Sequence, residues 1–404
     1  MPWNQVTKME IRKQFMEKVT EEGLSMAAAC RQFNVSRPTG YKWLERFEAQ
    51  GDAGLEDQSR APKRIPHRTA ESIEAHVVRL RSRHPTWGPK KLRAVLLRRF
   101  PEVDWPAAST MGDILDRKGL IPKLERSART PPHTRPLAHA LLPNDVWSID
   151  FKGQFLLGNG RLVYPLTVTD NASRMLLGCF GLETTTTELV QPLVHQLFRE
   201  FGRPLAIRSD NGAPFASTGV LGLSKLSADW LANGVAHERI EVGHPEQNGR
   251  HERMHLTLKR ETARPGAADF LRQQERFDVF REEYNHVRPH EALGQTPPAE
   301  HYRRSERLFP DGVAPLDYSA FDLVMRVRKT GELRIRKSSI YVSMALAEQP
   351  VGLLEIDEDV WLVNFAGHDL GIFEPGDARI EPISRGRVAS ADDFESDDLE
   401  VEAG

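Results

Sequence analysis

Apolar residues in the stretch LSMAAACRQFNVSRPTGYKWLERFEAQG recur at the spacing of two short helices. Ser25 can cap a helix that runs through Phe33, and Ser36 can cap a second helix that Gly51 ends. Only two residues separate the first helix from the second cap, which is the spacing of a helix-turn-helix. The pattern therefore predicts a helix-turn-helix DNA-binding domain over residues 1–58, with an ordinary helical hairpin as the alternative.

Helical periodicity returns in three further stretches, residues 71–83, 88–100 and 107–118. They predict a second, winged or three-helix DNA-binding module over residues 69–125. Proline and arginine are frequent on both sides of it, so we expect linkers at residues 59–68 and 126–140. The basic first linker is expected to follow DNA phosphates rather than fold.

From residue 145 the pattern changes to β-rich runs separated by turn residues, in DVWSIDFKGQF, RLVYPLTVTDNASR and MLLGCFGLE. Helices and short strands then alternate, with helices predicted over 187–201, near 223–231, from Asn248 onward and over 267–287. This order predicts an α/β core with a mixed sheet over residues 141–306. Gly-bearing turns between strands predict a small all-β, barrel-like domain over residues 318–376.

The chain of 404 residues has a formal net charge of −2, but the charge is unevenly distributed. Between Arg60 and Arg135 there are 18 Lys/Arg and 7 Asp/Glu, whereas the residues after Arg387 hold 7 Asp/Glu and no Lys/Arg. A basic front half suggests a polyanion partner, although a solvated surface would look similar. The tail over residues 377–404 is expected to be acidic and disordered.

Two cysteines, Cys30 and Cys179, are too few for a disulfide framework or a zinc cluster. Any metal is therefore expected to have mainly oxygen ligands. No signal peptide or bilayer-spanning apolar run is recognisable, so we expect a soluble, cytoplasmic protein.

Two aspartates lie within or directly after predicted strands of the core, where a carboxylate is unusual. Asp150 lies between Ile149 and Phe151 in the first strand of the core, and Asp210 follows the later strand PLAIRS. Taken alone, Asp150 fits the exposed face of a half-buried strand and Asp210 fits a plain Asp-Asn-Gly turn. Together with a glutamate near the start of a later helix, they predict a Mg²⁺ or Mn²⁺ site in which two ions about 4 Å apart assist attack on phosphorus.

The motifs WSIDFKG, RSDNG, NGRHERMHLTLKRE and YNHVRPHEALGQTPPAEHY resemble the integrase-core transposases of bacterial insertion sequences. These DDE recombinases are related to retroviral integrase, and the likeness extends over nearly the whole chain. It implies a ribonuclease H-like core and a transposase that binds terminal inverted repeats, cleaves at the 3′ ends and transfers the 3′ hydroxyls to target DNA. It also implies that Asp150 and Asp210 hold one ion, that Asp150 and Glu252 hold the other, and that a homodimer or higher multimer acts on DNA.

The third carboxylate has two candidates, Glu246 and Glu252. A separation of 35 residues from Asp210, which the family suggests, selects Glu246, because 246 − 210 − 1 = 35. The motif selects Glu252, which stands three residues after an Asn-Gly pair, with the helix starting at Asn248, although the separation is then 252 − 210 − 1 = 41. We favour Glu252, because a helix holds a ligand more rigidly than a loop does.

Cationic and polar residues at the predicted helix starts, in the first linker and after Glu252 are the expected DNA contacts: Arg37, Thr39, Lys42, Lys63, Arg64, Lys90, Lys91, His255, Lys259 and Arg260. Glu252, His255 and Lys259 are expected on one face of their helix. Basic residues between Arg326 and Lys337 suggest further phosphate contacts by the β domain. Two alternatives stay open, a DNA-binding regulator or inactive domesticated relative, and a nuclease of the same fold that cuts without joining.

Overall fold

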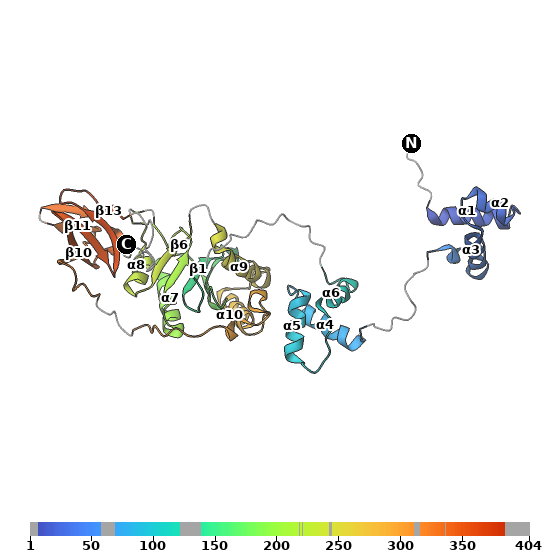
Figure 1. Ribbon diagram of the computed structural model, residues 1–404, viewed down its shortest axis with the longest axis horizontal. Helices are drawn as coiled ribbons and strands as arrows, with labels where there is room; N and C mark the ends of the chain where they lie inside the picture. Colours follow the sequence, from blue (N-terminus) through green and yellow to red (C-terminus); the bar gives the residue numbers. More distant parts are fainter. Residues whose placement is uncertain are drawn as a thin grey trace, which may run out of the picture. The chain divides into compact units, whose positions relative to one another are not determined.

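The computed structural model describes residues 7–57, 69–121, 139–217, 219, 221–241, 245–310, 316–335 and 337–383. The chain divides into two compact units, Met1–Thr69 and Ala70–Gly404 (Figure 1). Among the described residues, no helix combines the length and the apolar character needed to cross a bilayer.

The first unit is a helix-turn-helix with one additional helix in front of it. Its elements are α1 (Lys8–Thr20), α2 (Met26–Gln32), α3 (Arg37–Gln50) and the 3-10 helix η1 (Gly51–Leu55). Ser36 caps α3 as expected, since its hydroxyl accepts from the backbone N–H of Thr39, whereas Ser25 stands at the start of α2 without a side-chain capping bond. Helix α1 completes the core by burying Phe15 and Met16 against α2.

Helices α2 and α3 pack so closely at Gly40 that there is no room for a side chain. A β-carbon at Gly40 would lie 2.7 Å from both Cys30 Sγ and Met26 Sδ and 3.1 Å from the ring of Phe15. We expect Gly40→Ala to destabilise the first unit by about 1–3 kcal/mol, because overpacking forces neighbouring side chains apart. Hydrogen exchange of peptides from α2 and α3 in the full chain would measure this. The exposed Glu48→Ala serves as the control, and equal protection in the two variants would contradict the prediction.

The second unit begins with the predicted module in its three-helix form. Helices α4 (Glu71–Arg83), α5 (Pro89–Arg99) and α6 (Ala108–Arg117) match the predicted stretches to within a residue at each end. They share a core of buried side chains, Val77, Trp87, Leu92, Leu96, Trp105, Met111 and Leu115.

The α/β core follows with a mixed sheet. Its strands are β1 (Val146–Phe151), β2 (Phe155–Leu156), β3 (Leu162–Asp170), β4 (Leu176–Leu182), β5 (Ala206–Ser209) and β6 (Ala236–Arg239). The longest path through the sheet is β2-β3-β1-β5-β6, and β4 also pairs with β3. Strand β1 is antiparallel to β3 and parallel to β5, so it lies in the middle of the sheet.

Helices cover both faces of this sheet. The helical elements are α7 (Thr187–Phe201), α8 (Lys225–Ala232), η2 (Pro245–Asn248), α9 (Gly249–Thr262), α10 (Phe270–His286), η3 (Glu291–Leu293) and η4 (Pro298–Glu300). Trp147 and Ile149 of β1 pack with α7 and α8, while α9 and α10 share a second cluster with β4. The alternation of a strand therefore sends Ser148 and Asp150 to the α9 side.

The β domain completes the described chain. Its elements are β7 (Leu323–Arg326), β8 (Glu332–Ile335), β9 (Ser338–Tyr341), the 3-10 helix η5 (Met344–Leu346), β10 (Pro350–Asp357), β11 (Val360–Phe365), β12 (His368–Phe373) and β13 (Glu381–Pro382). A five-stranded sheet has the order β13-β12-β11-β10-β7, and β8 pairs with β9. Structure thus continues past the expected boundary at residue 376, because β13 pairs with β12 and Ile380 is buried. Residues 384–404 of the predicted acidic tail lie outside the described residues.

Candidate active site

Asp150 lies near the end of the central strand, in a sheet covered on both faces. Its backbone pairs with Thr167 of β3, and its side chain is 21% exposed. The four preceding residues of β1 are all buried. Asp150 therefore does not lie on the exposed face of a half-buried strand. A carboxylate this far inside needs a hydrogen-bond network or a cation.

Asp210 directly follows β5, the parallel neighbour of β1. The register pairs Val146 with Ala206 and Ser148 with Arg208, and the same offset carried two residues further places Asp210 opposite Asp150. Adjacent strands are about 4.8 Å apart. The Asp210 carboxylate accepts from the backbone N–H of Gly212 at 3.1 Å, so the Asp-Asn-Gly turn also orients it.

Glu252 lies in the first turn of α9, and its side chain is exposed. The helix begins at Gly249 with Asn248 at the capping position, as expected, although the Asn248 side chain makes no capping bond. The backbone of Glu246 belongs to the short 3-10 helix η2 rather than to an open loop, and its side chain lies outside the described residues.

The electrostatics of Asp150 connect the three carboxylates. Burial, helped by the negative charge of Asp210, raises the pKa of Asp150 to about 7. Glu252 adds a smaller effect in the same direction, while the Phe151 backbone N–H and the charge of Lys152 oppose it. Like charges that interact in this way favour a bound cation.

Two buried histidines of α9 surround Asp150 from the helix side. The Thr167 hydroxyl donates to the Asp150 carbonyl oxygen at 3.2 Å and lies 2.7 Å from Nε2 of both His251 and His255. One hydroxyl proton cannot serve all these partners, so at least one imidazole donates to Thr167. Nδ1 of His255 lies 3.7 Å from the Asp150 carboxylate.

The expected DNA contact at His255 does not fit this position. His255 is 4% exposed, and burial lowers its pKa, so its ring is neutral and faces the protein interior. The exposed face of α9 instead carries Glu252, Leu256 and Lys259. His255 was expected on the same face as Glu252, but three residues along a helix with a broad buried stripe can separate an exposed position from a buried one.

The segment HERMH also matches the HExxH pattern of zinc metalloproteases, whose two histidines hold the metal. Here both ring nitrogens of His251 are occupied by hydroxyls, since Nδ1 lies 2.8 Å from Thr169 Oγ1. Asp150, His251 and His255 do bring ligand atoms within 4.8 Å of one another. Threonine hydroxyls engage both ring nitrogens of His251 and Nε2 of His255, which leaves carboxylate oxygens as the main accessible ligands. Such oxygens fit Mg²⁺ or Mn²⁺.

Known family models match the helical modules and the α/β core. Integrase core domain models match residues 140–245 and 233–298, a helix-turn-helix domain model matches residues 11–63, and a homeodomain-like domain model matches residues 39–115. An uncharacterized 39.2 kDa protein of insertion element IS476 from Xanthomonas euvesicatoria is 28% identical over 251 residues, which is 61% of this chain and 69% of that protein. The chain therefore contains helix-turn-helix and integrase core domains and is similar to proteins of bacterial insertion elements.

Two other similarities cover a smaller part of the chain. An uncharacterized 31.7 kDa protein of insertion element IS407 from Burkholderia multivorans is 31% identical over 160 residues, covering 39% of this chain and 55% of that protein. The catalytic core domain of HTLV-2 integrase in complex with magnesium aligns with 40% of this chain and 99% of its own, at 15% identity and a TM-score of 0.32.

The expected DNA-binding residues differ in their surroundings: some are exposed, some lie beside carboxylates, and some are outside the described residues. Arg37 and Lys42 are exposed on α3, and the Thr39 hydroxyl lies 2.8 Å from that of Ser36. Lys259 and Arg260 are exposed on α9. Lys63 and Arg64 lie outside the described residues. Lys90 and Lys91 of α5 lie beside carboxylates of the core, with Lys90 Nζ 2.9 Å from Glu291 Oε1.

Sequence reasoning missed the threonines and the inward role of the histidines. A usable signal was present: Thr167 and Thr169 alternate along one strand face, and His251 and His255 are four residues apart on one helix face. Each pattern alone is compatible with a surface. Only the packing of α9 against β3 shows that the two sets meet.

Proposed function

We propose that this protein is a DDE-type DNA transposase that binds terminal inverted repeats, cleaves at the 3′ ends of its element and joins those ends to target DNA. The observation that supports this most is that Asp210 directly follows β5, the parallel neighbour of the strand that holds Asp150, and that the charges of Asp210 and Glu252 both act on the Asp150 carboxyl group. Three converging carboxylates with an open approach are suited to phosphoryl transfer.

Asp150 and Asp210 would hold one divalent ion, and Asp150 with Glu252 would hold the second. Two bound Mg²⁺ ions, for which Mn²⁺ can substitute, would activate the attacking oxygen and stabilise the leaving one. The chain itself contributes orientation: the Gly212 N–H aims the Asp210 carboxylate, and α9 holds Glu252 at the open side of the site. The negative charges of Asp210 and Glu252 lie near Asp150, so a cation bound there would relieve their mutual repulsion.

The reaction would proceed in two exchanges at phosphorus. Water attacks the phosphodiester at the element end, so that a new P–O bond forms and the bond to the 3′ oxygen breaks, leaving a 3′ hydroxyl. That hydroxyl then attacks a target phosphodiester and displaces the target's 3′ oxygen. The number of phosphodiester bonds is conserved in the joining step, so no ATP or covalent enzyme intermediate is needed.

DNA binding would use the helix-turn-helix unit for the element ends. Exposed Arg37 and Lys42 lie in the first two turns of α3, where a recognition helix contacts bases and phosphates. The β domain has exposed Arg326, Arg328 and Lys329 for non-specific phosphate contact, while Arg336 lies outside the described residues. Two element ends must be brought together, so we propose a homodimer or higher multimer on DNA.

An oligonucleotide assay tests this function. The full chain is incubated with labelled DNA copied from the flanks of its element and with unlabelled plasmid, in Mg²⁺ or Mn²⁺. We expect nicked 3′ ends followed by labelled plasmid, both abolished by a chelator. Cleavage without labelled plasmid would indicate a nuclease of the same fold, and bound DNA that stays uncut with either ion would indicate a DNA-binding regulator.

A further inference from the structure

The second helical module, residues 70–121, meets the core through a set of polar contacts between distant parts of the sequence. His84 Nδ1 lies 2.8 Å from Glu283 Oε1, and Thr86 Oγ1 lies 2.5 Å from Glu261 Oε1. Lys90 pairs with Glu291, and Arg98 pairs with Glu300. In each case the module supplies the cation or donor, and the core supplies the carboxylate.

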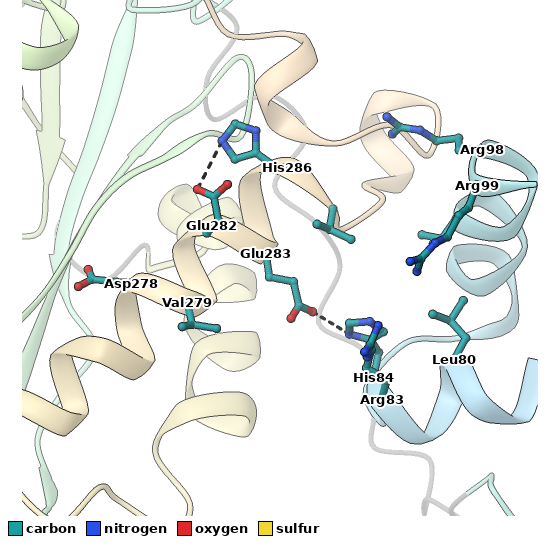
Figure 2. A pocket seen from close by; sticks show the side chains of 12 residues that line it. Leu80, Arg83, His84, Arg98, Arg99, Asp278, Val279, Glu282, Glu283 and His286 are labelled. Carbon is teal, nitrogen blue, oxygen red and sulfur yellow. Dashed lines mark ion pairs between the residues drawn. The ribbon is translucent and has the colours of Figure 1, made fainter.

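A cleft between α4, α5 and α10 shows the same distribution of charge. Figure 2 shows Arg98 and Arg99 on the module side, facing Glu283 and its neighbours on α10. The dashed contact between His84 and Glu283 crosses the cleft at one end. Opposite charges on facing walls attract, and several pairs together are worth more than isolated surface pairs.

Glu261 links this contact to the candidate active site. Its Oε1 accepts from Thr86 and also from Arg288 Nη1 at 2.8 Å, and Arg288 is buried. Glu261 and Glu252 belong to the same helix, α9, separated by nine residues or about 13.5 Å along the axis. The contact between Thr86 and Glu261 therefore fixes the distance between the helical module and Glu252.

Helix α6 is left uncovered by this docking. Within the described residues, no hydrogen bond or ion pair joins α6 to the core, and Ser109, Asp113 and Arg117 are exposed on it. In a homeodomain-like unit the third helix is the one that enters the major groove. The module can thus contact the core through α4 and α5 and DNA through α6.

We propose that the face formed by Glu261, Glu283, Glu291 and Glu300 is the docking surface for the second helical module of the same chain, and that the module stays docked when DNA is bound. Lys90 is then a docking residue rather than a DNA contact. The docked module presents DNA at a defined distance from Glu252. This last consequence rests on the proposed function, whereas the docking does not.

Carbodiimide cross-linking of the full chain tests the docking without any catalysis. Lys90 and Glu291 are both about 70% exposed and 2.9 Å apart, so the reagent can activate the carboxyl group and an amide can form with loss of water. We expect a Lys90–Glu291 cross-linked peptide both without DNA and with a saturating end oligonucleotide. Glu291→Gln is the control, and it should remove that peptide alone.

Three outcomes would overturn the proposal. No Lys90–Glu291 peptide in either condition would show that the module does not dock there. A peptide that disappears on adding DNA would show that DNA displaces the module, which makes the contact inhibitory. Mixing ¹⁵N-labelled with unlabelled chains identifies the third outcome, a peptide that joins two copies.

A charge exchange tests the consequence for catalysis. Arg98→Glu and Glu300→Arg each place like charges opposite one another, and each is expected to lower accurate end cleavage about fivefold. The double variant restores the pair with reversed polarity and should return to within about twofold of the wild type. Single variants that cleave normally, or a double variant no better than either single one, would refute the positioning role. If no protein cleaves, the cross-link still decides the docking.

Discussion

Glu252→Gln is expected to abolish both cleavage and joining, by at least about 10³-fold, while DNA binding and folding are retained. The substitution removes a negative oxygen ligand, and each bound ion contributes several kcal/mol to the stability of the transition state. Glu252 is exposed, so its loss should change the free energy of unfolding by no more than about 0.5 kcal/mol. Single-turnover cleavage of the end oligonucleotide, with gel-shift binding measured alongside, provides the test.

Glu246→Gln is the matched control, because it makes the same chemical change six residues earlier. It should cleave within a few fold of the wild type, since its backbone lies in η2 and not on α9. Asp150→Asn and Asp210→Asn should lose activity to the same extent as Glu252→Gln. An inactive Glu246→Gln beside an active Glu252→Gln would transfer the third ligand to Glu246.

Thr167→Val is expected to have the largest effect on stability among substitutions near the site, about 2–4 kcal/mol. Its hydroxyl is the partner of Nε2 in both His251 and His255, and each buried group left without a partner costs about 1–3 kcal/mol. Valine has nearly the same shape, so the loss reports hydrogen bonding rather than a cavity. Urea unfolding of the full chain would measure the shift.

Two further variants separate the hydroxyl from other effects. Thr167→Ser keeps the hydroxyl and should lie within about 1 kcal/mol of the wild type. Thr169→Val affects only Nδ1 of His251 and should cost about half as much as Thr167→Val. Equal stability of Thr167→Val and the wild type would mean that the two histidines find other partners.

Much of the architecture follows from local pattern. The period of apolar residues predicted α4 and α7 with the bounds that the structure shows, and Ser36 was correctly predicted as the cap of α3. Such features depend on neighbours within a few residues, because helix caps and amphipathic faces are local properties. The boundary at residue 376 was placed too early, since β13 has only two residues and forms through pairing with β12.

For the candidate site, the sequence by itself determined which carboxylates to consider and the helix on which Glu252 lies. Only the tertiary structure decided that Asp150 is covered on both sides, that His255 turns inward to Thr167 and that Lys90 meets Glu291. These facts depend on contacts between residues 17 to 201 positions apart. A local period says that one side of a helix is buried, but the partner that buries it belongs to another part of the chain and is chosen by packing.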